Sequence, residues 1–150
     1  MGKHEIALQP QLSEVARLLD WVERTAMAEG ISGEIVFRVM LAIEEAVTNV
    51  IRHAFADLPS PHVLRVRLEI GVEELTAAVI DNGRPFDPST VPEPDLTKPL
   101  GEREPGGLGI HLMRGVMDRI DYCRTDGFNR LTLVKRLAET PPERKTGRGR

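Results

Sequence analysis

The strongest hydrophobic pattern in the chain runs from Ser32 to Phe55 and predicts one long helix. Its apolar positions alternate steps of three and four residues, so they lie on one continuous stripe that faces a core. These positions are Val36, Met40, Ile43, Val47, Ile51 and Ala54. Ser32 is suited to cap the helix, because its hydroxyl can accept a hydrogen bond from a free backbone N–H.

Shorter patterns predict the elements before residue 81. A strand is expected over 4–8, and helical spacing of apolar residues follows from 12 to 28, where Gly30 ends it. Residues 63–70 and 75–80 read as two strands separated by a short turn, which predicts a hairpin.

The regular hydrophobic pattern ends after Asp81. Between Asn82 and Pro105 lie six of the eleven prolines and no periodic pattern, which is typical of a working loop such as a lid. A helix is then expected over 110–117. Two final strands, 120–124 and 131–137, are expected to be joined through residues 126–129.

Composition predicts one globular domain over residues 1–138, followed by a disordered basic tail over 139–150. The net charge is -3, and the last eight residues carry four basic groups against one acid, so the preceding 142 residues carry -6. An acidic body of this kind argues against nucleic acid as the main partner. The sequence has no membrane-spanning run and no signal-peptide core, so we expect a cytoplasmic protein without a membrane anchor.

The single cysteine and the four histidines suggest no further site. Cys123 is the only cysteine, so an intramolecular disulfide is excluded, and we expect Cys123 to be a small buried residue in a strand. The histidines are scattered and have no partner at metal-ligand spacing, so a zinc site is not indicated.

Glu45, Asn49 and His53 follow one another at four-residue intervals on the long helix, away from its apolar stripe. On a surface helix such residues are usually only solvated. Facing a ligand, the Asn49 oxygen could complete the coordination of Mg²⁺ held by phosphate oxygens and water. Glu45 could take a proton from an attacking hydroxyl, whereas a structural hydrogen bond is expected for His53.

The triplet Asp81-Asn82-Gly83 ends an apolar strand. Asn-Gly is a strong signal for a two-residue hairpin turn, but that interpretation requires a strand to follow. The next residues include Pro85 and Pro88, which cannot pair inside a sheet. We therefore expect the mouth of a pocket, where a carboxylate would accept a hydrogen bond from an exocyclic amine and favour adenine over guanine.

The run Gly106-Gly107-Leu108-Gly109 leads directly into a helix. It is either a flexible hinge or a loop whose backbone N–H groups and helix dipole hold phosphate oxygens. The run has no lysine, and it matches neither the P-loop pattern nor the dinucleotide-binding fingerprint.

Taken together, these motifs closely resemble the Bergerat-fold (GHKL) ATPases, and among them the small bacterial anti-sigma-factor serine/threonine kinases. The sequence EEAVTN, which contains Glu45 and ends at Asn49, matches the family's N box, which continues to His53. Asp81-Asn82-Gly83 matches the adenine-binding box, and Gly107-Leu108-Gly109 matches the glycine box. The resemblance covers about residues 4–137.

The resemblance implies a fold and a set of roles. The fold is a two-layer α/β (α+β) sandwich, a mixed and mostly antiparallel sheet covered by three helices, with an ATP lid over 84–105. Glu45 would be the catalytic base, Asn49 the magnesium ligand and Asp81 the reader of adenine. Gly83, His53 and the residues from Gly106 to Gly109 would complete the ATP site. A basic lid residue would meet the terminal phosphate, with Arg84, Lys98 and Arg103 as candidates.

The implied activity is ATP- and Mg²⁺-dependent phosphorylation of a serine or threonine on an anti-sigma-factor antagonist. The same protein would sequester a sigma factor, usually as a homodimer. Two alternatives stay open at this point: a non-catalytic, nucleotide-gated module that binds another regulator, and a degenerate domain that binds neither nucleotide nor metal.

Overall fold

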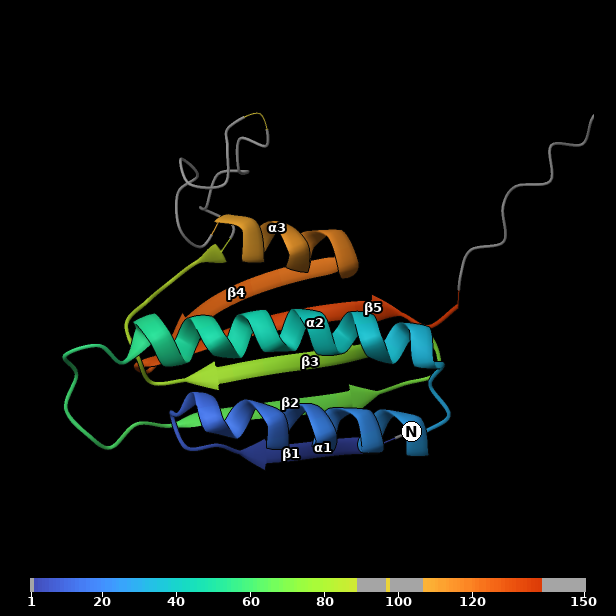
Figure 1. The fold of residues 1–150 in the computed structure, drawn as a ribbon, viewed down its shortest axis with the longest axis horizontal. Coiled ribbons are helices and arrows are strands. Elements are labelled where there is room, and N and C mark those ends of the chain that lie inside the picture. The colour runs from blue at the N-terminus through green and yellow to red at the C-terminus, as the bar shows by residue number, and fades with distance from the viewer. Residues whose placement is uncertain (1, 89–96, 98–106, 139–150) are drawn as a thin grey trace, which may run out of the picture.

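The computed structural model describes residues 2–88, 97 and 107–138, and the expected basic tail, Gly106 and most of the expected lid lie outside this part of the chain. Five strands form one sheet in the order β1-β2-β3-β5-β4 (Figure 1). Each neighbouring pair is antiparallel, so the described residues contain no parallel pair. The strands are β1 (Gly2–Ala7), β2 (Leu64–Ile70), β3 (Glu74–Asp81), β4 (Arg119–Thr125) and β5 (Phe128–Arg136).

All the helices of the described residues lie on one face of this sheet, and α2 runs between α1 and α3 (Figure 1). This arrangement confirms the predicted two-layer sandwich. The helical segments are the 3-10 turn η1 (Leu12–Glu14), α1 (Val15–Ala28), α2 (Gly33–Asn49), the π-helical turn η2 (Val50–Ala54) and α3 (Gly107–Val116). Ser32 caps α2 as expected, and its hydroxyl accepts a hydrogen bond of 3.5 Å from the backbone N–H of Ile35.

The core fills the space between α2 and the sheet. Val36, Ile43, Val47 and Ala54 of the predicted stripe are buried, whereas Met40 and Ile51 are partly buried. The sheet contributes alternate residues from its helix-covered face, because successive side chains of a strand point to opposite sides. The largest of these fully buried sheet residues are Leu64, Leu68, Leu75 and Leu133.

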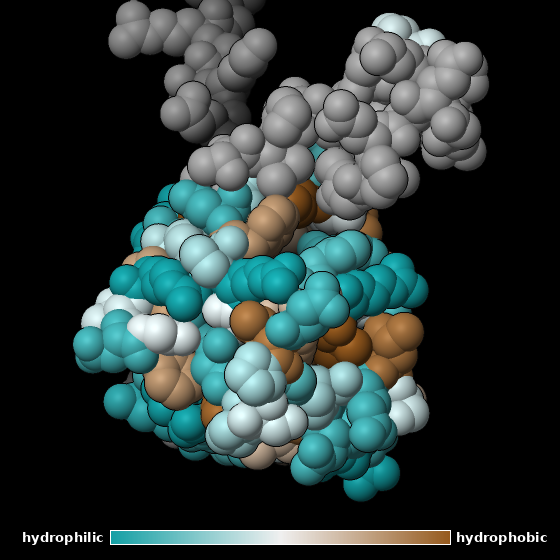
Figure 2. Space-filling view, turned by 90° about the vertical axis from the view of Figure 1, so that its left-hand side faces the viewer, coloured by the Kyte–Doolittle hydropathy of each residue, from teal (hydrophilic) through white to brown (hydrophobic). Residues whose placement is uncertain are grey.

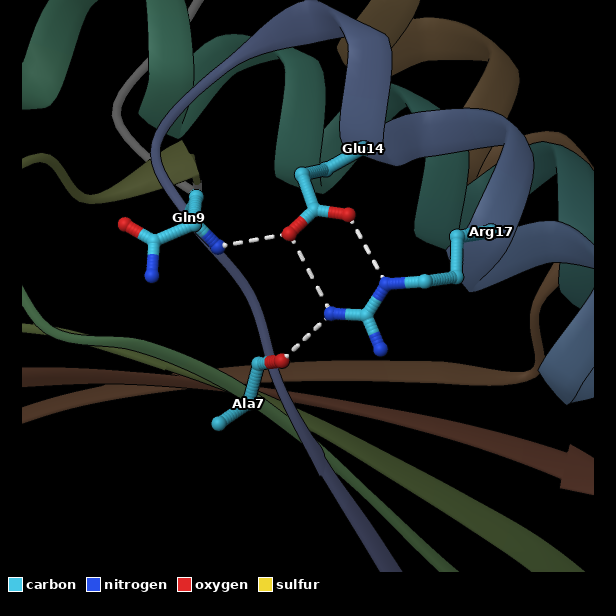
Figure 3. A network of polar contacts seen from close by, with 4 residues as sticks. All are labelled: Ala7, Gln9, Glu14 and Arg17. Carbon is cyan, nitrogen blue, oxygen red and sulfur yellow. Dashed lines mark hydrogen bonds and ion pairs between the residues drawn. The ribbon is translucent and has the colours of Figure 1, made fainter.

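A charged network fastens the start of α1 to the end of β1 (Figure 3). Arg17 donates two hydrogen bonds to the Glu14 carboxylate, of 2.8 Å and 3.2 Å, and a third of 2.8 Å to the Ala7 carbonyl. Glu14 also accepts the backbone N–H of Gln9 at 3.1 Å. The hydrogen bonds from Arg17, and then that from Gln9, hold the pKa of Glu14 below its ordinary value. The network therefore fixes how the chain passes from the sheet layer to the helix layer.

Two details of the C-terminal hairpin differ from the sequence-based expectation. The turn consists of Asp126 and Gly127 alone, both with positive φ, so Phe128 and Asn129 belong to β5 and not to a loop. Cys123 is in a strand, as expected, but it is exposed and not buried. It is exposed because it points to the sheet face opposite Ile120 and Tyr122, away from the helices.

No helix in the described part of the chain is both long enough and apolar enough to cross a membrane.

Shortening a core side chain of α2 tests this packing. Ile43 is fully buried, so Ile43→Ala should lower the free energy of unfolding by about 2–5 kcal/mol, the sum of lost burial and a residual cavity. Val72→Ala is the control, because Val72 is 78% exposed and should change stability by less than about 0.5 kcal/mol. Urea unfolding followed by circular dichroism measures both, and equal effects of the two substitutions would contradict the assigned core.

Candidate functional site

A cavity of about 410 Å³ lies between α2, the β3–β5 part of the sheet and the segment that leaves β3. Most of its lining is apolar, which suits a flat hydrophobic ligand. Figure 2 views the end of the molecule shown at the left of Figure 1, where hydrophobic residues are exposed among hydrophilic ones. The apolar lining comes mainly from Ala46, Val50, Val79, Pro85, Phe86, Ile110, Met113 and Leu131.

Asp81 is the acidic residue of this cavity and is only 4% exposed. Its Oδ1 accepts a hydrogen bond of 2.8 Å from the backbone N–H of Gly83 and one of 2.9 Å from Asn129 Nδ2. Burial raises the pKa of Asp81 above its ordinary value of 3.8, because a carboxylate is poorly solvated there. The two hydrogen bonds and the nearby Arg124 oppose this rise in pKa without cancelling it.

The second oxygen of Asp81, Oδ2, has no hydrogen-bond partner among the described residues. In this part of the chain, every fully buried side-chain nitrogen and oxygen does have a partner. Oδ2 must therefore keep access to the cavity that Asp81 lines. It offers a ligand one buried acceptor, suited to an amino group.

Gly83 is required by close packing of the backbone. A Cβ at this position would lie 2.6 Å from the carbonyl oxygen of Ala54 and 2.6 Å from the Cβ of Ala54. The next residue, Arg84, donates its backbone N–H to the same carbonyl at 2.9 Å. The chain thus crosses from β3 to the end of η2 and makes no hairpin turn, as the two prolines predicted.

Asn82 supports this crossing from the other side. Its Oδ1 accepts the backbone N–H of Val63 at 2.7 Å, and its Nδ2 donates to the Pro61 carbonyl at 2.9 Å. The three residues of the triplet therefore act differently, since Asp81 faces the cavity, Asn82 holds the loop before β2, and Gly83 permits contact with η2.

A second, more polar cavity of about 670 Å³ adjoins the first along α2. Glu45 and Gly109 lie in it, and Asn49 and His53 line both cavities. The structure thus brings together the three helix residues that the four-residue spacing predicted. The helix is α-helical up to Asn49 and π-helical from Val50, so His53 follows a wider turn than a regular helix would give.

His53 itself differs from expectation. A structural hydrogen bond was expected, but its ring makes none with the described residues, and the residue is exposed at the border of the two cavities. Arg84 is also exposed, lines the first cavity, and forms no side-chain ion pair or hydrogen bond with the described residues. Lys98 and Arg103, the other candidates for a phosphate contact, lie outside the described residues.

The glycine-rich run packs against the Glu45 side chain at Gly109. Gly107 begins α3, and Gly109 packs so tightly that a Cβ there would overlap Glu45 Oε2 and lie 3.1 Å from Glu45 Cδ. A helix start presents free backbone N–H groups and the positive end of the helix dipole, which favour anions. Leu108 lies in this first turn, and Gly106, just before it, is outside the described residues.

The donor set around Asn49 fits a metal that arrives with a ligand. The described residues contain no group of three histidine, cysteine, aspartate or glutamate side chains that could enclose a metal ion. The Asn49 side chain has no hydrogen-bond partner among them, and its amide borders both cavities. One free amide oxygen suits Mg²⁺, which takes few protein ligands and fills its octahedron with phosphate oxygens and water.

Sequence reasoning missed Asn129 and Tyr122, which also line the first cavity. The sequence pattern predicts Asn129 in a loop, whereas in the structure it lies in the sheet opposite Asp81. A signal was available, because Asp-Gly is a strong marker of a two-residue hairpin turn. Applied at Asp126-Gly127, it would have placed Asn129 within β5.

Comparison with known proteins identifies relatives. A family model described as the histidine kinase-like ATPase domain matches residues 8–135. The serine/threonine-protein kinase BtrW of Bordetella bronchiseptica is 34% identical over 120 residues, which cover 80% of this chain and 84% of BtrW. The serine-protein kinase RsbW of Bacillus cereus is 28% identical over 132 residues, covering 84% and 80% of the two chains. For RsbW of Staphylococcus aureus the identity is 26% over 91 residues, or 58% of this chain and 57% of that one.

Solved structures show the same fold. The crystal structure of the RsbU and RsbW domains of a Mycobacterium tuberculosis protein superposes with a TM-score of 0.66 at 17% identity. It covers 93% of this chain, but this chain spans only 33% of that one. The histidine kinase domain of a blue-light activated kinase from Erythrobacter litoralis gives a TM-score of 0.52 at 20% identity, covering 83% and 60% of the two chains.

The raised pKa of Asp81 predicts how stability depends on pH. Well below pH 3.8 the carboxyl is neutral in both the folded and the unfolded chain. As the pH rises from 3.8 through the raised pKa, the carboxyl ionises more readily in the unfolded chain than in the folded one, so the folded protein loses stability. Asp81→Asn keeps an oxygen for the Gly83 and Asn129 donors but cannot ionise. Its stability relative to the wild type should therefore increase as the pH rises from 3 to 7.

Urea unfolding at a series of pH values measures this difference. The exposed Asp57→Asn variant is the control for removing one carboxylate from the surface. A stability difference between Asp81→Asn and the wild type that falls with rising pH would show that the Asp81 pKa is lowered by folding and not raised.

Proposed function

The chain belongs to the histidine kinase-like ATPase domain family, on the branch of the protein kinases BtrW and RsbW, and we propose that it is an ATP-dependent serine/threonine-protein kinase. One observation supports this proposal above the others. Two cavities of different chemistry, one apolar with a buried acceptor and one polar with a free carboxylate, share Asn49 and His53. A nucleotide has the same division into an aromatic end and an anionic end.

The first cavity would hold adenine. Its apolar lining would cover the faces of the ring, and Asp81 Oδ2 would accept a hydrogen bond from the 6-amino group. Guanine has a carbonyl oxygen at that position. This oxygen and the carboxylate are both hydrogen-bond acceptors, so they would repel each other. Because the acceptor is charged and buried, this one hydrogen bond contributes about 1.5–3 kcal/mol to binding.

The second cavity would hold the phosphates. The first turn of α3 at Gly107–Gly109 would provide backbone N–H groups, and the glycine at 109 leaves no side chain between them and Glu45. The Asn49 oxygen would be the protein ligand of Mg²⁺, which when bound neutralises charge on the phosphate oxygens. Arg84, at the first cavity, is the described candidate for a basic contact from the lid.

Glu45 would act as the general base. In the transfer, the hydroxyl oxygen of the acceptor forms a bond to the terminal phosphorus, the bond from this phosphorus to the bridging oxygen breaks, and ADP leaves. The hydroxyl proton passes to the Glu45 carboxylate. Glu45 lies in the open polar cavity and makes no hydrogen bond with the described residues, so its carboxylate is available for this role.

The resemblance to anti-sigma-factor kinases suggests the physiological partners. We propose that the acceptor is a serine or threonine of an anti-sigma-factor antagonist, that the chain also sequesters a sigma factor, and that it acts as a homodimer. A nucleotide-gated module without catalysis is the second candidate. The free carboxylate of Glu45 favours the kinase, because a module that only binds needs no base.

Removing the base should separate transfer from binding. Glu45→Gln should lower phosphoryl transfer by about 10²–10⁴-fold, the usual contribution of a general base, while ATP affinity changes little. Transfer is measured with labelled ATP, Mg²⁺ and candidate antagonist proteins encoded nearby, and affinity by calorimetry. Glu34→Gln on the exposed first turn of α2 is the control.

The outcomes distinguish the candidate functions. Transfer at the wild-type rate by Glu45→Gln would show that Glu45 is not the base. ATP binding by the wild type with no transfer to any candidate would favour the non-catalytic module. If the wild type bound no ATP, both candidate functions would be wrong.

A second substitution tests the adenine end. In Asp81→Asn the amide would turn an N–H toward the cavity, because its oxygen is held by Gly83 and Asn129. Affinity for ATP should then fall about tenfold or more. Affinity for purine riboside triphosphate, which lacks only the 6-amino group, should change less than about threefold. Equal losses for the two nucleotides in calorimetry would refute a contact between Asp81 and the amino group.

A further inference from the structure

Asn129 is the most highly bonded side chain near the first cavity and is only 5% exposed. Its Nδ2 lies 2.9 Å from Asp81 Oδ1, 2.8 Å from the Arg84 carbonyl and 3.3 Å from the Gly83 carbonyl. Its Oδ1 accepts hydrogen bonds from the Tyr122 hydroxyl at 2.6 Å and from Arg124 Nη1 at 2.9 Å. Asn129 thus connects β5 and β4 with the end of β3 and with the first residues after it.

These bonds use all the capacity of the side chain. A carboxamide has two N–H donors and one oxygen with two lone pairs. Three acceptors already surround the two donors, and two donors already surround the oxygen. Although Asn129 lines the cavity, it has no polar atom left for a nucleotide, so its effect on the ligand must pass through Asp81 and the adjoining backbone.

Tyr122 and Arg124 decide which way the amide points. Both groups donate, so they require the oxygen of Asn129 on their side and turn its N–H groups toward Asp81. Arg124 Nη1 also donates to the Gly83 carbonyl at 2.9 Å, so one guanidinium holds both the Asn129 side chain and the backbone that follows Asp81. Arg124 has no hydrogen bond to Asp81.

We propose that Asn129 and Arg124 are positioning residues for nucleobase selection: together they hold the Asp81 carboxylate with Oδ1 engaged and Oδ2 facing the cavity, and they anchor the start of the lid at Gly83 and Arg84. The inference rests on the proposed binding of ATP in this cavity. It adds that selection of the 6-amino group depends on two residues that do not touch the nucleotide.

The physical reason lies in the torsion of the carboxylate. Rotation about the bond that carries an aspartate carboxyl is broad, with no sharp staggered minimum. Within the protein, the Gly83 N–H and Asn129 Nδ2 select one orientation from this range. Without the Asn129 donor, only the hydrogen bond from the Gly83 N–H remains. The carboxylate can then rotate so that neither oxygen has a favourable angle for a hydrogen bond with the amino group.

Asn129→Asp tests the first residue with little change of shape. The new carboxylate can still accept from Tyr122 and Arg124 but places an oxygen where Asp81 needs a donor. The preference for ATP over purine riboside triphosphate, the ratio of the two dissociation constants from calorimetry, should fall from about tenfold or more to less than about threefold.

Arg124→Met tests the second residue, which makes no hydrogen bond to Asp81 but bonds to Asn129 and to the Gly83 carbonyl and lies near enough to Asp81 to act on its charge. It should also reduce the preference to below about threefold. Arg119→Met is the matched control on the same strand, because Arg119 pairs with Asp121 on the sheet face away from the cavity. This variant should keep the wild-type ratio.

The ratio separates positioning from general damage, because a variant that only loosens the cavity weakens both nucleotides equally. A wild-type ratio in Asn129→Asp or Arg124→Met would overturn the inference. If the wild type itself binds neither nucleotide, the proposed function fails. If it binds both equally, then the contact of Asp81 with the amino group is wrong, and the inference falls with it.

Discussion

The buried hydrogen bond between Asp81 and Asn129 is the interaction on which the first cavity depends. An ionised carboxyl that is 4% exposed is costly unless donors compensate for the lost water. Asp81 keeps only two donors, both on one oxygen, and burial still raises its pKa. The fold thus retains an incompletely satisfied carboxyl group next to an apolar cavity, where hydrophobic packing alone would favour an apolar residue.

Strand register makes this interaction possible. Asn129 lies opposite Asp81 only because β5 begins directly after the turn Asp126-Gly127, and a slip by one residue would turn Asn129 to the other face of the sheet. The same register places Arg124 opposite Asn129. Three strands therefore meet at one polar cluster, and the two-residue turn that precedes β5 determines the register of that cluster.

Much of the fold could be predicted from the sequence, because the periodic segments are long and each has one buried face. The apolar stripe of α2 and the alternation of apolar and polar residues in β2 each indicate one buried face, and together they predict a helix layer packed on a sheet layer. The path of the chain after Asp81 also followed from local chemistry, since Pro85 and Pro88 cannot pair inside a sheet and so excluded a hairpin. Whether Asp81, Glu45 and Gly109 contact a nucleotide in these roles stays a prediction.

What could not be predicted depends on contacts between distant segments or on small departures from regular structure. The local Asp126-Gly127 signal could place Asn129 in β5, but not opposite Asp81, because that partner is 48 positions away. The exposure of Cys123 depends on which face of β4 the helices cover. The π-helical turn at Val50–Ala54 adds no visible break to the apolar pattern, yet it changes the direction in which His53 points.

The two close glycine contacts explain why the helix after Ser32 serves both ends of the site. Gly83 approaches the backbone at Ala54, and Gly109 approaches the side chain of Glu45. Nine residues separate these contact points, which corresponds to roughly 13 Å along a helix. Both glycines therefore contact the same helical segment, and the separation of their two contact points follows from the length of α2 and η2 between Glu45 and Ala54. The two cavities are spaced along the helix that both share through Asn49 and His53, so their spacing does not depend on the length of the chain between Gly83 and Gly109.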